Sequence, residues 1–347
     1  MGRVSRRDVL LGSLALAGGV WAGGLGLDQA WAVNGPTIVS CDGWGARPNR
    51  GTLPVYDRRP VKILVHHTAT PNTAATSRDA ATKLARSIQK FHMDHRGWPD
   101  TGQHFTVTRG GVVLEGRHRS LEFVRVGKRQ VEGAHCTGQN VVALGIENEG
   151  TYSSVDPPAA QWEKLRSLCA YLCGQYGIRP TEIYGHRDFK DTACPGDRLY
   201  AELPRLRTEV AGLLGQSLKK ATVSPAAWPL LRIADRGERV LAAQHLLRAA
   251  GVPKVVPDGR FTRELVDTVR AFQAERGFGR DDAMSLASAS PGPTGMIGGE
   301  SWPALARPVH AGEGGEAQQA VEVLLRNRDV RLPEVVTPQI WQRLLAP

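Results

Sequence analysis

The stretch YGHRDFKDTACPGDRLY, residues 184–200, places His186 and Cys194 in one loop that follows a short strand candidate starting at Ile183. Far upstream, His66 ends the apolar run Val61–Val65. Two imidazoles and a thiolate suit Zn²⁺, and three protein ligands leave the fourth position open for water. Single buried histidines and cysteines are more commonly core residues. The three together nevertheless predict a catalytic zinc site formed by His66, His186 and Cys194.

Strand and helix patterns alternate upstream of that loop. Apolar residues recur at helical spacing within 77–95 and 159–176, and Gly177 marks the expected end of the second helix. Strands are expected at Val61–Val65, at Phe105–Leu114 with a turn at Gly110-Gly111, at Val141–Ile146 and at Ile183–Gly185. This alternation predicts an α/β domain over residues 38–215.

The sequence after the α/β domain is helical. A polar, proline-bearing stretch at 216–229 predicts a linker. Amphipathic patterns at 239–250 and 263–276, with a shorter one at 300–305, predict a smaller all-α domain over residues 230–306. Residues 307–347 form a partial repeat that echoes the first and third of these helices. A segment of that size cannot hold a core alone, so we expect it to pack on the preceding domain.

Residues 1–32 have the pattern of an export signal. Arg6 and Arg7 precede an apolar, glycine-rich stretch, and small residues around Trp31 provide a cleavage position. The arrangement resembles a twin-arginine (Tat) signal peptide. A membrane anchor is the alternative, but glycine dilutes the stretch below the ~20 strongly apolar residues that a span requires. We therefore expect cleavage after Ala32, a mature form without a membrane span, and secretion to the extracellular space or the cell wall.

The composition limits the class of protein and its partners. With 347 residues, of which 41% are hydrophobic and 22% charged, the chain can bury more than one core, which excludes a disordered or fibrous protein. The formal net charge is +10, and nearly all of the excess lies in residues 33–220. A basic domain favours an anionic partner, either a nucleic acid or a polyanionic wall or membrane surface. Because the sequence has no long basic run and no nucleic-acid motif, we expect no nucleic-acid partner. We also expect a monomer.

Five segments of the α/β domain carry a family resemblance. They are Val65-His66-His67-Thr68, Gly102–Phe105 leading to Glu115-Gly116-Arg117, Gly133-Ala134-His135, Leu144–Gly150 and Tyr184–Tyr200. Together they resemble the zinc-dependent N-acetylmuramoyl-L-alanine amidases of the type 2 amidase and peptidoglycan-recognition protein family. The resemblance implies a mixed β-sheet flanked by helices and a zinc ion held by His66, His186 and Cys194. It also implies bacterial peptidoglycan as partner, with hydrolysis of the amide between N-acetylmuramic acid and the L-alanine of the stem peptide.

The same resemblance suggests further site residues. Many relatives carry a tyrosine where this chain has Gln103, which cannot titrate, so Glu147 is the expected general base. Thr192 is expected to help stabilise the tetrahedral oxyanion, and Gln103 and His135 to lie near the substrate. Plainer alternatives remain. Glu147 could be a solvated carboxylate, Thr192 a turn residue, and His135 a partner of a buried backbone carbonyl.

Residues 231–306 carry a second resemblance. The pairs Arg236-Gly237, Asp258-Gly259 and Thr294-Gly295 resemble the three-helix peptidoglycan-binding module called PGB type 1, from which a Ser/Ala/Pro-rich insertion at 280–293 departs. This resemblance implies an anchor that raises the enzyme's local concentration at an insoluble wall. Relatives that lose the cysteine ligand bind muramoyl peptides without cutting them, so a non-catalytic recognition protein is the alternative function. The presence of Cys194 favours the enzyme.

Four cysteines remain besides Cys194, and they allow three pairings into two disulfides. They are Cys41, Cys136, Cys169 and Cys173. Some recognition proteins tether an N-terminal cysteine to the long helix, so the resemblance implies a bond from Cys41 to Cys169 or Cys173. Alternatively, the two helix cysteines only fill the inner side of the helix.

Overall fold

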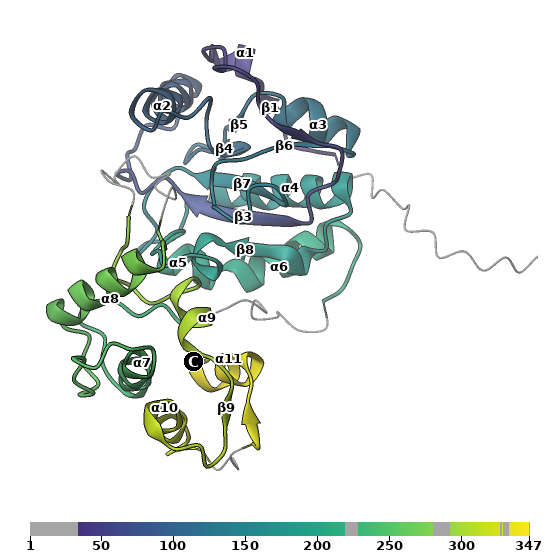
Figure 1. Cartoon of the computed structure of the whole chain (residues 1–347). Coiled ribbons are helices and arrows are strands. Elements are labelled where there is room, and N and C mark those ends of the chain that lie inside the picture. Colours follow the sequence, from purple (N-terminus) through teal and green to yellow (C-terminus); the bar gives the residue numbers. More distant parts are fainter. Residues whose placement is uncertain (1–33, 219–227, 280–291, 327, 329–332, 347) are drawn as a thin grey trace, which may run out of the picture.

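A computed structural model describes residues 34–218, 228–279, 292–326, 328 and 333–346 (Figure 1). The expected export signal of residues 1–32 and most of the insertion at 280–293 lie outside these ranges. The first unit is built around a six-stranded sheet, and the second is a cluster of helices that lies beside one end of the first.

The sheet is mixed, with strand order β1-β5-β4-β7-β3-β8. β4 and β5 form an antiparallel hairpin, whereas β7 pairs in parallel with β4 and β3, β3 with β8, and β1 with β5. This confirms the predicted α/β class and the mixed sheet flanked by helices. The strands are β1 (Ile38–Val39), β3 (Lys62–His67), β4 (Phe105–Val107), β5 (Val113–Glu115), β7 (Ala143–Asn148) and β8 (Ile183–Gly185), and β2 (Val55–Tyr56) pairs separately with β6 (Gln130–Val131).

Local sequence signals explain where the main helices begin and end. Ser77 caps the first long helix by accepting a hydrogen bond from the backbone N–H of Ala80, and Gly177 ends the longest helix with φ 72°. The helices of this unit are α1 (Cys41–Trp44), α2 (Arg78–Lys90), the π-helix η1 (Phe91–His95), α3 (Ser120–Val126), α4 (Ala159–Tyr176), the 3₁₀ turns η2 (Pro180–Glu182) and η3 (His186–Asp188), α5 (Asp197–Ala201) and α6 (Leu203–Leu213).

The main core lies between one face of the sheet and helices α4 and α6. Ile63 and Val65 of β3 and Ile146 of β7 meet Leu165 and Leu206 there, and all five are fully buried. Successive side chains of a strand point to opposite faces. His66 of β3 and Glu147 of β7 therefore lie on the face away from α4, which leaves them free to form a site.

The helices of the second unit pack around one hydrophobic core, whose described members run from Trp228 to Leu345. Trp228 stacks on Trp302, so the end of the expected linker belongs to this core. The partial repeat at 307–347 packs into the same core, chiefly through α10 against α7. Beside its helices, the unit contains one short antiparallel strand pair, an addition to the expected all-α pattern. Its elements are α7 (Glu238–Ala249), α8 (Arg263–Glu275), α9 (Ser301–Leu305), β9 (Val309–His310), α10 (Gly315–Leu325), β10 (Val335–Val336) and α11 (Pro338–Leu345).

All five cysteines are free thiols, so the disulfide implied by the family resemblance is absent from the described residues. Cys41 packs in a separate cluster with Trp44 and donates a hydrogen bond to the carbonyl of Gly116. Cys169 and Cys173 lie inside the main core on α4, which matches the alternative that they only fill the inner side of the helix.

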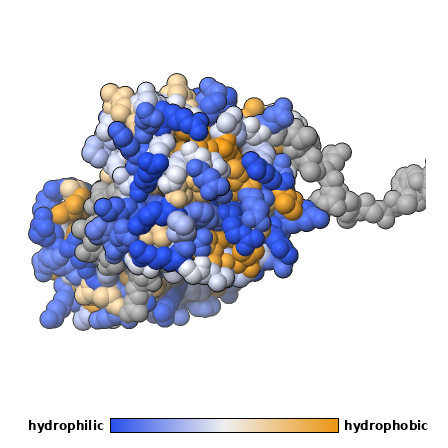
Figure 2. Space-filling view, turned by 90° about the horizontal axis from the view of Figure 1, so that it is seen from above, coloured by the Kyte–Doolittle hydropathy of each residue, from blue (hydrophilic) through white to orange (hydrophobic). Residues whose placement is uncertain are grey.

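None of the helices in the described ranges combines the length and apolar character that a membrane crossing requires. Figure 2 shows mostly hydrophilic residues on the face seen from above, with hydrophobic residues gathered in patches between them. Apolar patches of this kind are ordinary on folded proteins.

Candidate metal centre and active site

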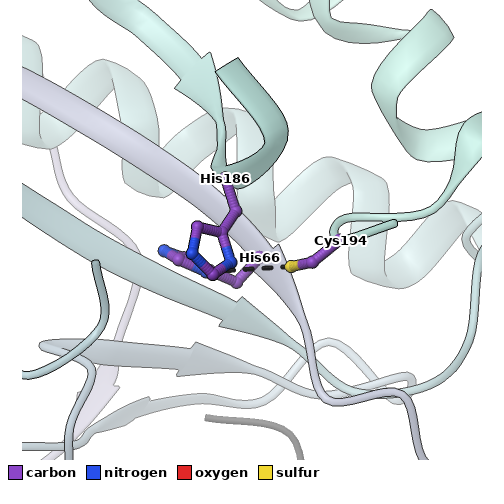
Figure 3. A group of neighbouring side chains, drawn as sticks. All are labelled: His66, His186 and Cys194. Atoms are coloured by element: carbon purple, nitrogen blue, oxygen red, sulfur yellow. Dashed lines mark hydrogen bonds between the residues drawn. The ribbon is translucent and has the colours of Figure 1, made fainter. Parts of the chain in front are cut away.

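His66, His186 and Cys194 converge on one point, although 128 residues separate the first from the last (Figure 3). One ligand atom from each lies within 4.8 Å of the others. The Nδ1 atom of His66 is 3.7 Å from the sulfur of Cys194, and the two imidazole centroids are 4.5 Å apart. This is the only such group of three or more metal-binding side chains in the described part of the chain.

The parallel pairing of β3 with β8 brings the two histidines together. Val65 lies in register with Gly185, so the residues that follow them, His66 and His186, emerge side by side at the same edge of the sheet. The backbone N–H of Gly185 donates to the Asp188 carboxylate at 2.8 Å, which shapes the turn after β8. The loop then returns, because the backbone N–H of Arg187 donates to the carbonyl of Cys194 at 3.1 Å.

A chain of hydrogen bonds fixes the protonation of His66. The Nε2 atom of His135 lies 3.2 Å from the carbonyl oxygen of Ala143, which can only accept, so this nitrogen carries the hydrogen. The Nδ1 atom of His135 therefore accepts, and the Nε2–H of His66, 3.1 Å away, donates to it. The remaining nitrogen of His66, Nδ1, is left with its lone pair toward Cys194.

Two glycines make room for this imidazole chain. A Cβ atom at Gly145 would lie 2.5 Å from Cγ of the His135 ring, and a Cβ at Gly133 would lie 2.5 Å from Cδ2 of the same ring. Neither distance is possible for a real side chain. The site therefore needs glycine at both positions so that His135 can reach His66.

Burial shifts the pKa of two of the three candidate ligands, His66 and Cys194. It lowers the pKa of His66 well below the usual range, with further lowering by the neighbouring histidines, so this imidazole is neutral at pH 7 and can bind a metal. Burial also raises the pKa of the Cys194 thiol, and the nearby Glu147 carboxylate raises it further. A divalent cation at this point would reverse that shift and deprotonate the thiol. The donor set and its charges fit zinc.

Glu147 is an acidic side chain that lies next to His66 on the sheet. It lies in register with His66 on one side and with Thr106 on the other. It is 2% exposed, and within the described residues its Oε2 atom has no hydrogen-bond partner. Burial raises the pKa of Glu147 to about 8. The side chain is thus buried and is not the solvated carboxylate that the sequence left open.

Gln103 and His135 are both buried. The amide nitrogen of Gln103 donates to the Thr106 hydroxyl at 2.9 Å. Thr106 lies in register with Glu147 on the neighbouring strand, so Thr106 stands between Gln103 and Glu147 in this set of contacts. His135 is fully buried behind His66, so the geometry favours its alternative reading as a partner of a backbone carbonyl. The sequence analysis did not identify Thr106 as a site residue. The one sign of its place near the site is its position in β4, in register with Glu147.

Thr192 lies in the loop before Cys194 and is partly exposed. Its hydroxyl oxygen accepts a hydrogen bond from the backbone N–H of Cys194 at 3.2 Å. That contact is the turn role named as its alternative, and it leaves the hydroxyl hydrogen available for another acceptor.

Both units of the chain resemble known proteins. The profile of the N-acetylmuramoyl-L-alanine amidase family (Amidase_2) matches residues 56–197, and that of a peptidoglycan binding domain (PG_binding_1) matches residues 236–281. A human protein named N-acetylmuramoyl-L-alanine amidase is 36% identical over 162 residues, which cover 45% of this chain and 26% of that protein. Peptidoglycan-recognition protein SC2 of Drosophila simulans is 34% identical over 177 residues, which cover 50% of this chain and 88% of that protein.

Among solved structures, wild-type PGRP-LB of Drosophila matches with 29% identity and a TM-score of 0.43, covering 48% of this chain and 92% of that chain. The chain spans only about a quarter of the human relative but most of the insect recognition protein. Because the Drosophila simulans protein is 34% identical and is matched over 88% of its length, the chain belongs to the N-acetylmuramoyl-L-alanine amidase and peptidoglycan-recognition protein family.

Proposed function

We propose that the protein is a secreted, zinc-dependent N-acetylmuramoyl-L-alanine amidase that cuts the amide between N-acetylmuramic acid and L-alanine in bacterial peptidoglycan. The observation that carries the proposal is the convergence of His66, His186 and Cys194 beside Glu147, whose buried Oε2 atom has no hydrogen-bond partner among the residues the structure describes. Zinc, when bound by these three side chains, would polarise the scissile carbonyl and lower the pKa of water.

In this proposal Glu147 moves the protons. Its Oε2 atom takes a proton from the attacking water and gives it to the leaving nitrogen of L-alanine. Burial raises the pKa of this carboxyl to about 8, and a zinc ion at the site would lower it again, which favours the carboxylate that accepts the first proton. Its burial keeps bulk water away from this exchange.

The other residues position or stabilise. His135 holds His66 in the tautomer that presents Nδ1. Gln103 orients Thr106 next to Glu147. The hydroxyl of Thr192 would donate to the oxyanion that forms on the scissile carbonyl, because its oxygen already accepts from the Cys194 backbone.

We further propose that the domain at 230–306, together with the packed residues 307–347, binds the wall, with anionic wall polymers as possible additional partners. The match to a peptidoglycan binding domain supports wall binding by this unit. The basic excess lies in residues 33–220, so it supports contact of anionic wall polymers with the first unit. A recognition protein without catalysis is the second candidate, because some matched relatives are named recognition proteins. The intact cysteine of the metal group favours the enzyme.

Digestion of purified sacculi tests the proposed function. Incubation with the protein should release peptides with new L-alanine amino termini, and a chelator should stop the release until zinc is added back. New reducing sugar ends would instead indicate a glycosidase. Binding of sacculi with no new termini would indicate the recognition protein.

A further inference from the structure

Asp191 lies in the loop between His186 and Cys194, yet its carboxylate points into the second unit of the protein. It is 5% exposed. One oxygen, Oδ1, accepts from the backbone N–H groups of Gly298, Glu300 and Ser301 at 2.7, 3.2 and 3.0 Å. The other, Oδ2, accepts from the Ser301 hydroxyl at 2.6 Å and from the Gln273 amide at 2.9 Å.

Further contacts join the same loop to the same unit. The hydroxyl of Thr294 donates to the backbone carbonyl of Asp191 at 2.7 Å. Lys190 forms a 2.8 Å ion pair with Glu300, and both side chains are largely buried. The chains approach so closely that a Cβ atom at Gly299 would lie 2.5 Å from the backbone carbonyl of Asp188. Of the donors to Asp191, Ser301 begins α9, which Figure 1 shows just below α5 of the first unit, and Gln273 lies on α8.

These contacts are costly to lose. In the described chain, every donor to the Asp191 carboxylate comes from residues 273–301. A buried carboxylate without donors pays the full desolvation penalty of a charged group. Without the second unit, Asp191 would have to turn toward water, and the backbone that leads to Cys194 would move with it.

We infer that the C-terminal unit is a working part of the metal centre and not only an anchor. By holding Asp191, it fixes the loop in the position where Cys194 meets His66 and His186. Asp191 is thus a positioning residue that acts through Cys194. This inference rests on the proposed metal site. It means that a change at Gln273 or Gly299 lowers the affinity of the site for zinc.

Matched glutamines in the full-length protein give the first test. Gln273→Ala removes a donor to Asp191. Gln244→Ala removes an equally buried amide of the same unit, one that binds Asp258 and the backbone N–H of Gly259 instead. Zinc affinity, measured by competition with a chelator, should fall about tenfold in Gln273→Ala, since supporting residues of metal ligands commonly contribute 10 to 100-fold. Gln244→Ala should stay within about twofold of wild type.

Matched glycines give the second test. Gly299→Ala adds a methyl group against the Asp188 backbone, whereas Gly212→Ala adds one on α6, where no atom lies within 4 Å. Amide hydrogen exchange of residues 186–194 in the metal-free protein should speed up in Gly299→Ala and Gln273→Ala only. Zinc affinity should fall in the same two variants. Asp191→Asn, which keeps one acceptor oxygen, should lose less affinity than Asp191→Ala.

Two results would overturn the inference. One is equal zinc affinity in all four matched variants, and the other is an equal loss in Gln273→Ala and Gln244→Ala, which would indicate general destabilisation. The proposed function fails separately, when wild-type protein binds zinc but releases no L-alanine termini from sacculi.

Discussion

Glu147 is the residue on which the proposed proton transfers depend. Its burial raises its pKa to about 8, and no described side chain or backbone group bonds its Oε2 atom. Such an unsatisfied buried oxygen is uncommon in folded proteins and costs stability, so its presence is consistent with a catalytic task. Glu149, two positions after Glu147 in the sequence, offers a comparison. Its Oε2 atom accepts a hydrogen bond from the backbone N–H of Arg109 at 2.8 Å.

Glu147→Gln should keep zinc and the fold but lose about 10²–10⁴-fold in kcat, because the amide cannot take a proton. Glu149→Gln should retain near wild-type kcat, since an amide oxygen can still accept from Arg109. Both rates are measured on a soluble muramoyl peptide, with zinc content determined on the same samples. Turnover of Glu147→Gln close to that of wild type would remove Glu147 from the mechanism.

At the scale of the elements, much of the α/β domain could be predicted. The longest helix was predicted with both ends because an apolar face runs along it and Gly177 stops it in the left-handed conformation. Helix α3 was missed, since its cap residue Arg119 makes no side-chain capping hydrogen bond and so gives no start signal. Strand β1 has two residues, too few to show a period.

The metal ligands could be proposed from the sequence because residue type and strand position both signalled them. The supporting contacts could not. The link from His135 to His66 depends on the orientation of two rings, which no local pattern encodes. The contacts of Asp191 with Gln273 and Ser301 cross 82 and 110 residues.

His104, which precedes β4 and contacts β7, should make the stability of the protein depend on pH. The backbone N–H of Gly145 donates to its Nδ1 atom, and its Nε2 atom contacts the carbonyl of Val131. Burial, with a smaller contribution from the Arg117 charge, lowers the pKa of His104 to about 4. The unfolded state, with a pKa near 6.5, therefore binds more protons between pH 4 and 6.5, so stability rises with pH in that window and is flat above it.

Urea unfolding of metal-free wild type and His104→Gln checks this. The variant should be less stable at pH 7, and the difference in free energy of unfolding should shrink toward pH 4.5. The whole lowering of the His104 pKa, from 6.5 to about 4, corresponds to on the order of 3 kcal/mol. The comparison cancels the titration of other buried histidines. A difference that is the same at both pH values would show that His104 does not titrate in the folded protein in this way.

At the scale of the whole molecule, polar contacts of the loop between His186 and Cys194 connect two units that each have a hydrophobic core. The main core lies under the sheet, and the second runs through the helices from Trp228 to Leu345. The polar contacts between them gather on Asp191 and Lys190, and an ion pair joins Arg232 to Asp197 just after the loop. Wall binding and hydrolysis are therefore expected to involve one connected body.

Zinc-edge X-ray absorption of the purified full-length protein tests the central claim most directly. The account predicts one zinc per chain, with one sulfur at about 2.3 Å and nitrogen neighbours at about 2.0–2.1 Å, and loss of the sulfur signal in Cys194→Ser. Protein isolated without stoichiometric metal, or zinc surrounded only by oxygen and nitrogen in the wild type, would contradict it.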